Sequence, residues 1–308
     1  MRHPAIFPAG SAPMSAPVLF CFGYGYSARA LAAVLRERGW QIRGTSRSAG
    51  TCEAMAADGV AAFRFDRDRP LDDAAAALAG VTHLLSSVPP DAAGDPVLDR
   101  HGADIAACAG SLAWCGYLST TGVYGDHAGG WVDEATALTP ATERGRRRVA
   151  AEAGWCGLWR DAGVPVHLFR LAGIYGPGRN ALATVRAGRA QRIVKPGQVF
   201  SRTHVDDIAA VLAASIDRPN PGAAYNVCDD DPAPPQDVIA HACALLGVEP
   251  PPEIPFAEAE LSPMARSFYA ECKRVSNGRT KGALGWRPLY PTYREGLTAV
   301  LEEEQAGA

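Results

Sequence analysis

The chain has 308 residues, a formal net charge of −3 and 47% hydrophobic residues. This length and apolar content suffice for one large α/β domain or for a domain and a half. The near-neutral charge gives no electrostatic reason to expect nucleic acid or an anionic membrane as a partner, and no stretch reaches the roughly 18 unbroken apolar residues of a membrane helix. We therefore expect a cytoplasmic protein that acts on a small molecule.

Eight cysteines are scattered along the chain, without a CxxC pair or a histidine at ligand spacing. They are typical of small core residues in a reducing compartment, so no metal site is expected. Residues 1–16 are rich in Pro, Ala and Ser and are expected to form a flexible tail. The apolar run that follows is too short for a signal peptide and ends in glycines.

Apolar strands alternate with longer helical patterns through the first 170 residues. The expected strands are 18–22, 41–45, 61–65, 81–86, 114–119 and 166–170, and the clearest helical patterns are 26–38, 98–111 and 142–162. This alternation predicts an α/β fold, a Rossmann-type doubly wound parallel sheet with helices on both faces. We expect an NADP-binding domain at 17–172, with sheet contributions from about 201–228, and a smaller C-terminal substrate lobe, irregular in structure, over 173–308.

A glycine-rich turn, GYGYSA (23–28), joins the first strand to the first helix and matches the G-x-G-x-x-G/A fingerprint. Gly23 permits the tight turn, and Gly25 lets the backbone approach a pyrophosphate. Ala28 keeps the helix close to the sheet. The free N–H groups at the helix start, around Tyr26 and Ser27, are expected to hold the anion.

The end of the second strand favours NADP over NAD. An NAD site places Asp or Glu there for the ribose hydroxyls, whereas this chain has Ser46 and Arg47, which suit a 2′-phosphate. The alternative is that Arg47 is an ordinary solvated charge. Asp66 ends the third strand and is expected at the adenine amine. Ser87 and Val88 follow the fourth strand and are expected beside the ribose.

Five motifs occur in a fixed order along the chain: GYGYSA (23–28), YLSTTGVYG (117–125), LFRLAGIYGPGR (168–179), RTHVDDIA (202–209) and AYNVCDDDP (224–232). In this the chain resembles the extended short-chain dehydrogenase/reductase superfamily, which includes NAD(P)-dependent nucleotide-sugar epimerases and dehydratases. The likeness covers nearly the whole chain after Ala16.

The resemblance implies a Ser or Thr and a Tyr-x-x-x-Lys pair as the catalytic groups. Thr120 takes the first position, but Arg144 and Arg148 replace the tyrosine and the lysine. Arginine keeps its proton at any ordinary pH, so Arg144 cannot act as an acid or base. Arg148 can still hold the nicotinamide ribose as the lysine does. This departure resembles the atypical branch of the superfamily.

A surrogate acid must then come from elsewhere, and Tyr124 is one hypothesis. The alternative is that Tyr124 serves packing or substrate contact. The loop that follows offers further polar groups: Asp126, His127, Asp133 and Glu134. Arg144 and Arg148 share one helix face by their spacing, so we expect an anion near them, either cofactor phosphate or an acidic substrate.

By resemblance, Gly173 and Ile174 meet the nicotinamide carboxamide at the carboxyl edge of the sheet. Residues expected to contact substrate are Arg144, Tyr175, Arg179, Arg202 and His204. The aspartates Asp206 and Asp207 are expected to anchor the lobe.

Two functions remain open from the sequence. The first is an NAD(P)-dependent oxidoreductase or epimerase-like enzyme that acts on a small polar molecule, with nucleotide sugars as one candidate class. The second is a non-catalytic NADP-binding sensor or regulatory protein. Loss of the Tyr-x-x-x-Lys pair favours the second, and the retained Thr120 and substrate-edge loops favour the first. A homodimer is one candidate assembly.

Overall fold

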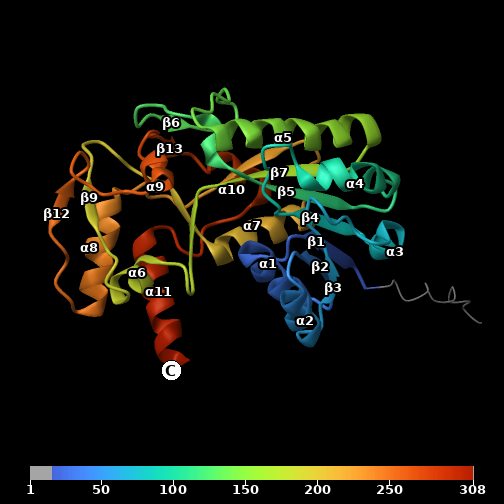
Figure 1. Cartoon of the computed structure of the whole chain (residues 1–308), viewed down its shortest axis with the longest axis horizontal. Coiled ribbons are helices and arrows are strands. Elements are labelled where there is room, and N and C mark those ends of the chain that lie inside the picture. Colours follow the sequence, from blue (N-terminus) through green and yellow to red (C-terminus); the bar gives the residue numbers. More distant parts are fainter. Residues whose placement is uncertain (1–15, 308) are drawn as a thin grey trace, which may run out of the picture.

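A computed structural model describes residues 16–307 of the chain, and most of the tail expected at 1–16 lies outside them. Seven parallel strands form the central sheet in the order β11-β7-β5-β4-β1-β2-β3 (Figure 1). Their bounds are β1 Val18–Phe22, β2 Gln41–Ser46, β3 Ala61–Arg64, β4 His83–Ser86, β5 Trp114–Thr120, β7 Val166–Leu171 and β11 Ala224–Val227. The predicted α/β class with a parallel Rossmann-type sheet is confirmed.

The strand order reverses beside β1. From β1 the chain builds outward through β2 and β3, then crosses back so that β4 pairs with the other side of β1. The loops that leave β1 and β4 therefore diverge at the carboxyl edge and leave a crevice between them, where ligands of open α/β sheets bind. The strand that the sequence indicated at 224–227 is β11, which pairs with β7 at the end of the sheet.

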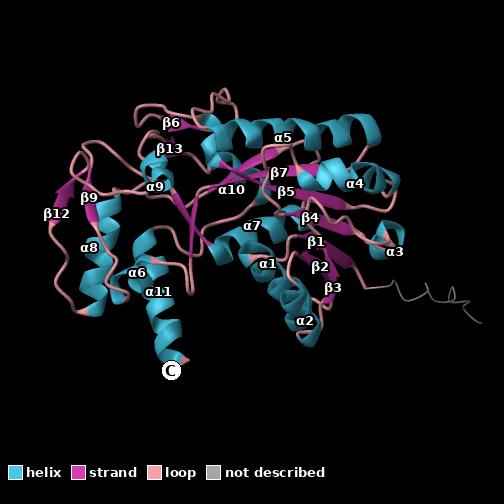
Figure 2. Ribbon diagram, in the orientation of Figure 1, coloured by secondary structure: helices cyan, strands magenta, loops and turns pink. Residues whose placement is uncertain are grey.

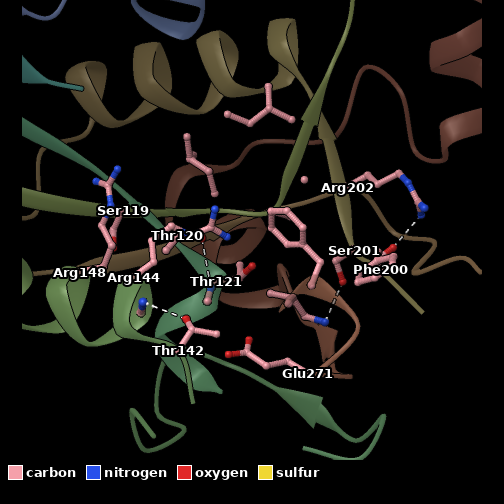
Figure 3. A pocket seen from close by; sticks show the side chains of 18 of the residues that line it. Ser119, Thr120, Thr121, Thr142, Arg144, Arg148, Phe200, Ser201, Arg202 and Glu271 are labelled. Carbon is pink, nitrogen blue, oxygen red and sulfur yellow. Dashed lines mark hydrogen bonds between the residues drawn. The ribbon is translucent and has the colours of Figure 1, made fainter. Parts of the chain in front are cut away.

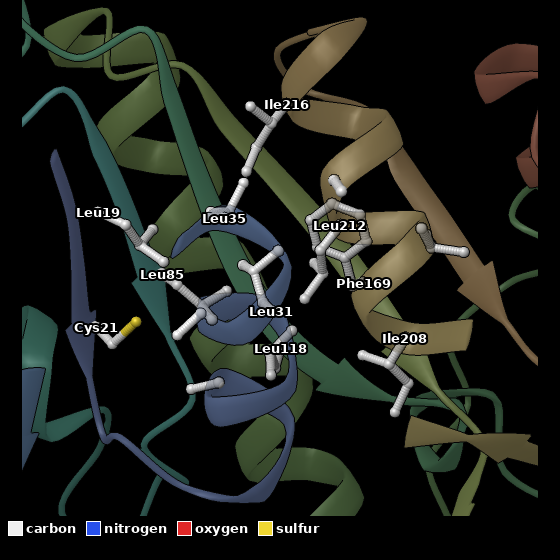
Figure 4. Packing of buried hydrophobic residues seen from close by; sticks show 14 of the residues in the cluster. Leu19, Cys21, Leu31, Leu35, Leu85, Leu118, Phe169, Ile208, Leu212 and Ile216 are labelled. Carbon is white, nitrogen blue, oxygen red and sulfur yellow. The ribbon is translucent and has the colours of Figure 1, made fainter. Parts of the chain in front are cut away.

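Two layers of helices cover the sheet (Figure 2). On one face lie α1 (Tyr26–Glu37) and α7 (Val205–Asp217), which pack on each other and bury Leu31, Leu35 and Leu212 against the strands (Figure 4). On the other face lie α3 (Ala74–Leu78), α4 (Pro96–Ala107) and α5 (Glu143–Ala162). The α2 helix (Ala49–Ala57) packs near β3.

The C-terminal residues are more regular than the sequence indicated. Beyond the sheet lie three two-stranded parallel pairs: β8 (Gly173–Tyr175) with β10 (Arg202–His204), β9 (Arg192–Val194) with β12 (Glu253–Pro255), and β6 (Trp131–Val132) with β13 (Arg274–Val275). The remaining elements are the 3-10 turn η1 (Thr121–Tyr124) and the helices α6 (Ala181–Arg186), α8 (Pro235–Leu246), α9 (Pro263–Phe268), α10 (Gly278–Leu284) and α11 (Tyr293–Ala306). Figure 1 shows α6, α8 and α11 grouped as a lobe beside the sheet.

Asp207 ties this lobe to the sheet domain. Its buried carboxylate accepts the backbone N–H groups of Leu289 and Tyr290, at 2.6 and 3.2 Å. This contact fits the anchoring role expected for the aspartate pair. All eight cysteines are free thiols, and within residues 16–307 every helix is too short or too polar to cross a bilayer.

Candidate functional site

The glycine-rich turn is held in shape by its neighbours. Gly23 has φ +80°, and its N–H donates to Thr45 Oγ1 at 2.8 Å. Its carbonyl accepts the Ser87 hydroxyl at 2.5 Å, and a Cβ added at Gly23 would stand 2.8 Å from that oxygen. Both the backbone angle and the space therefore require glycine here. Ser87 thus acts by fixing the turn from β4.

Gly25 leaves the start of α1 open. It is the N-cap residue, no side chain caps the helix, and the first turn has no acidic residue. A Cβ added at Gly25 would meet no described atom within 4 Å. The first N–H groups of a helix have no partner within it and carry the positive end of its dipole. Buried Ala28 lets this helix end sit close to the sheet, so the cradle suits a pyrophosphate.

A cavity of about 860 Å³ opens beside this helix end, between the sheet edge and the C-terminal residues (Figure 3). Of the residues predicted to bind cofactor, Gly25, Tyr26, Ser27, Ser87, Arg148, Gly173 and Ile174 line it. Gly23 and Val88 lie just behind the lining, in contact with one another, since a Cβ on Gly23 would be 3.2 Å from the Val88 side chain. The cavity thus runs from the glycine turn to the loop after β7.

The residues predicted for the adenosine end lie outside this lining, at the ends of β2 and β3. Arg47 has an exposed side chain, and its carbonyl accepts Arg64 Nη2 at 3.3 Å. The Ser46 hydroxyl accepts the Ser48 N–H at 3.3 Å, just before α2. Asp66 Oδ1 accepts the N–H groups of Asp68 and Arg69, both at 3.0 Å. Asp66 therefore commits one carboxylate oxygen to its own turn.

Thr120 ends β5 and begins η1. Its Oγ1 accepts the Gly122 N–H at 3.2 Å, which leaves the hydroxyl proton free to be donated. Gly145 keeps α5 tight against this turn, because a Cβ there would lie 2.9 Å from the Gly122 carbonyl oxygen. Thr120, Arg144 and Arg148 line the same cavity, as the motif alignment predicted.

The two arginines at the tetrad positions have different surroundings. Arg148 is half-buried, and its Nη1 donates to the Leu118 carbonyl at 2.6 Å and to the Tyr117 hydroxyl at 3.0 Å. Arg144 is exposed, with its guanidinium 4.7 Å from the centre of the Phe268 ring. Arg148 is therefore fixed to β5, whereas Arg144 stacks on Phe268, the last residue of α9.

Tyr124 does not fit the role of surrogate acid. Its side chain is fully buried away from the cavity lining, and its hydroxyl donates to Asn226 Oδ1 at 2.7 Å and accepts Arg170 Nη1 at 3.0 Å. Burial raises the pKa of this phenol, while Arg170 opposes the rise. Tyr124 points into the core because the 3-10 turn η1 reverses the chain after Thr120. Its environment is that of a packed core residue.

The polar residues of the following loop also serve its folding. Asp126 accepts the backbone N–H groups of Ala128 and Cys272. His127 Nε2 lies 3.1 Å from the Tyr124 carbonyl oxygen. Asp133 closes its own turn by accepting the Ala135 N–H. Glu134 Oε1 accepts the Asn226 N–H at 2.7 Å. None of these four side chains lines the cavity.

Three of the residues predicted to contact substrate reach the cavity from the loop and strands after β7: Tyr175, Arg179 and Arg202. Tyr175 directs its hydroxyl away, toward the Thr292 carbonyl at 3.5 Å. Arg202 Nη1 donates to the Phe200 and Ala233 carbonyls, at 2.8 and 3.0 Å. Arg179 is exposed at the rim.

His204 does not contact the cavity. It is buried between the rings of Tyr175 and Tyr290, and its Nδ1 accepts the Asp206 N–H at 3.2 Å as the cap of α7. Burial lowers the pKa of this imidazole to about 4. His204 is therefore a neutral capping residue, and the expected substrate contact is wrong.

The segment 261–275 forms a further wall of the cavity, and none of its lining residues was predicted as part of the site. It contributes Leu261, Ala265, Ser267, Phe268, Tyr269, Glu271, Lys273 and Val275 to the lining. No motif or periodicity marks these residues, because they meet the site only through the fold. A charged pair, Glu271 and Lys273, stands out within an otherwise largely apolar segment.

No family model matches the chain, but it resembles both curated and solved proteins. It is 54% identical to a functionally unknown conserved protein from Silicibacter pomeroyi DSS, with 94% of this chain and 99% of that chain covered and a TM-score of 0.86. It is 27% identical over 314 residues to the 3-diazoavenalumate denitrifying reductase of a Streptomyces species, covering 91% of this chain and 98% of that protein.

The fold also matches that of UDP-glucuronic acid 4-epimerase from Bacillus cereus, solved in complex with UDP-glucuronic acid and NAD. The TM-score is 0.74 at 16% identity, over 94% of this chain and all of that chain. At this identity the likeness concerns the fold alone. It places the glycine turn and the cavity described above within an architecture that holds a dinucleotide in that protein.

Proposed function

We propose that the chain is an NADP(H)-dependent oxidoreductase of the extended short-chain dehydrogenase/reductase superfamily and that it acts on a small anionic substrate. The observation that carries the proposal is the uncapped start of α1 opening directly onto a cavity that Thr120 also lines. A dinucleotide and a small molecule can thus meet at one place. The reductase from Streptomyces, alike over nearly its whole length, supports redox chemistry.

The residues present fit a phosphorylated dinucleotide along the carboxyl edge of the sheet. Gly25, Tyr26 and Ser27 would hold the pyrophosphate on backbone N–H groups. Ser46 and Arg47 would hold the 2′-phosphate, because β2 ends without the acid that an NAD site uses. When bound, the nicotinamide supplies or accepts a hydride.

At the reacting end, the chain's own residues would position both molecules. Arg148 has donors left over from its bonds to Leu118 and Tyr117, and these can bind ribose hydroxyls. Backbone groups of Gly173 and Ile174 would meet the carboxamide. Thr120 would donate a hydrogen bond from its free hydroxyl to the substrate oxygen and stabilise the charge that develops there.

The charge of the cavity selects the substrate class. Glu271 is the one acidic residue among the described residues of the lining, against five cations: Arg144, Arg148, Arg179, Arg202 and Lys273. A cleft lined by one sign of charge concentrates ligands of the other sign. We therefore expect a carboxylate or phosphate on the substrate, and nucleotide sugars satisfy this requirement.

A non-catalytic NADP sensor is the second candidate, and one observation favours it. The tyrosine position of the tetrad holds Arg144, which cannot transfer a proton and stacks on Phe268. A sensor would bind NADPH without turning over any substrate.

Fluorescence titration of the purified protein with NADPH and NADH tests the cofactor assignment, and we expect tighter binding of NADPH. Incubation with NADPH and a panel of aldehydes, ketones, keto acids and nucleotide sugars, followed by chromatographic product analysis, tests the enzyme. Product analysis is needed because an epimerase that recycles its cofactor gives no absorbance change. Binding of NADPH without any product would favour the sensor.

A further inference from the structure

Proton transfer at this site needs a group that the motif alignment does not supply. A carbonyl that accepts a hydride must also gain a proton, and Arg144 cannot give one. Apart from arginines, the described side chains of the lining that can carry a transferable proton in acid–base chemistry are Tyr26, Tyr175, Tyr269, Glu271 and Lys273.

The three phenols are poorly placed for this task. Tyr26 donates its hydroxyl to the Pro177 carbonyl at 3.0 Å, and Tyr175 donates to the Thr292 carbonyl. The Tyr269 ring is fixed between Phe200 and Phe256. Burial raises the pKa of all three phenols, which moves them away from neutral pH. General acids and bases work best with a pKa near the working pH.

Glu271 has a different environment. Its side chain is 10% exposed and lines the cavity. Oε2 accepts the Lys273 ammonium at 2.6 Å, whereas none of the residues that the structure describes bonds to Oε1. A buried carboxylate oxygen without a partner is costly, so a ligand that donates to it is favoured. Figure 3 shows Glu271 and the Thr120–Thr121 turn on the wall of this one cavity.

Glu271 is also fixed relative to Thr120. Lys273 Nζ donates at 2.6 Å both to Glu271 and to the carbonyl of Gly125, the residue that ends the turn begun by Thr120. Between them, the Cys272 N–H donates to Asp126 at 2.7 Å, and the Cys272 carbonyl accepts two N–H groups from the same loop. Segment 271–273 and the turn after β5 therefore form one rigid unit, as acid–base catalysis requires.

We infer that Glu271 is the catalytic acid–base of this site and that Lys273 positions it, in place of the absent Tyr-x-x-x-Lys pair. The inference rests on the proposed function. In alcohol oxidation, the substrate O–H proton passes to Glu271 Oε1 while the C–H bond breaks and its electron pair leaves with the hydrogen to NADP⁺. The products are the carbonyl compound, NADPH and protonated Glu271, which releases the proton to water. Carbonyl reduction runs the same steps in reverse, and Thr120 donates a hydrogen bond to the same oxygen.

The experiment compares Glu271→Gln and Glu271→Asp with Glu260→Gln, which makes the same change at an exposed glutamate of the preceding segment. Three properties are measured for each protein: NADPH affinity by fluorescence, turnover of the carbonyl panel, and calorimetric binding of the corresponding alcohols to the NADP⁺ complex. We expect Glu271→Gln to lose about 100-fold or more in turnover. Its NADPH affinity should stay within about twofold, because Glu271 is not among the residues proposed to hold the dinucleotide.

The alcohol-binding measurement separates chemistry from folding. Glu271→Gln keeps the shape of the side chain, so an alcohol should still bind, but without the proton transfer to buffer that we expect of wild type. Glu271→Asp should recover part of the turnover. Lys273→Arg should retain more turnover than Lys273→Met, since arginine can still reach a carboxylate and a carbonyl.

The outcomes are distinct. Wild-type turnover that survives in Glu271→Gln, or that is lost in Tyr269→Phe instead, overturns the inference and leaves the oxidoreductase proposal standing. A wild type that binds NADPH but converts no panel member and binds no alcohol overturns the proposed function, and the acid–base role falls with it.

Discussion

The guanidinium of Arg170 forms an ion pair with the carboxylate of Glu152, with Nη2 2.8 Å from Oε2 and Nε 3.1 Å from Oε1. Both side chains are almost completely buried. Burial alone would lower the pKa of Arg170, but the bonds to Glu152 raise it. Ser119 donates to the same carboxylate at 2.5 Å, one residue before Thr120. A paired charge between β7 and α5 therefore supports the end of β5.

Removal of Glu152 should destabilise the protein strongly. Glu152→Ala leaves Arg170 charged and buried without its counterion, and we expect a loss of about 3–5 kcal/mol in the free energy of unfolding. Urea denaturation measures this change. The matched control is Glu143→Ala, which removes an exposed partner of Arg146 and Arg147 from the same helix and should leave the unfolding midpoint unchanged. Equal midpoints for the two variants would contradict a stabilising role of the buried pair.

Asp229 should make the protein less stable as pH rises. Burial raises the pKa of this carboxyl to about 8 against an ordinary value of 3.8, while nearby Arg202 opposes the rise. The folded state therefore binds the proton more tightly than the unfolded state does. The resulting stability is complete below about pH 4 and is lost as pH rises through 8.

Asp229→Asn removes this titration, because the amide stays neutral. We expect the variant to match wild type in melting temperature only below about pH 4, where Asp229 is neutral in both the folded and the unfolded state, to exceed it increasingly between pH 4 and pH 8, and to exceed it most at pH 9. Thermal unfolding across this range measures the difference. Asp237→Asn, at an exposed carboxyl of α8, should follow the wild-type curve. Parallel curves for Asp229→Asn and wild type would show that Asp229 ionises normally.

The sequence predicted what depends on local pattern. The turn at Gly23 and Gly25, the six central-sheet strands β1 to β5 and β7, and Thr120 in the cavity all follow from motif, period or spacing. Side-chain direction after a turn does not: Tyr124 lies only four residues past Thr120, yet η1 turns it into the core toward Asn226. A linear pattern carries no signal for that reversal.

The residues that complete the site lie far from its motifs in the sequence, so the sequence pattern did not indicate them. Glu271 and Lys273 reach the cavity because β13 pairs with β6, a two-stranded contact too short to show a hydrophobic period. His204 failed as a substrate contact for a similar reason, since only the fold brings Tyr175 and Tyr290 around it. Burial depends on such distant neighbours.

Arg148 should contribute to cofactor binding through the donors that Leu118 and Tyr117 leave free. Arg148→Ala removes those donors, and we expect NADPH affinity to fall about 10-fold, the cost of one hydrogen bond to a polar ligand. Arg148→Lys restores the family's residue and should recover most of the affinity. Fluorescence titration measures both variants, with circular dichroism as the check on folding. An Arg148→Ala protein that folds and binds NADPH like wild type would remove Arg148 from the site.

Arg47 should decide between the two dinucleotides, because its exposed guanidinium follows β2 where a 2′-phosphate would lie. Arg47→Ala should weaken NADPH binding about 10- to 100-fold, since a charge-assisted bond to phosphate is lost, and should change NADH binding less than about twofold. Arg36→Ala, at an exposed arginine of the far end of α1 that donates to the Asp58 carbonyl, is the matched control and should leave both affinities unchanged. Equal losses for NADPH and NADH would mean that Arg47 serves the shared part of the cofactor. If Arg47→Ala binds both NADPH and NADH as tightly as wild type does, Arg47 is a solvated surface charge, and any cofactor preference would depend on Ser46.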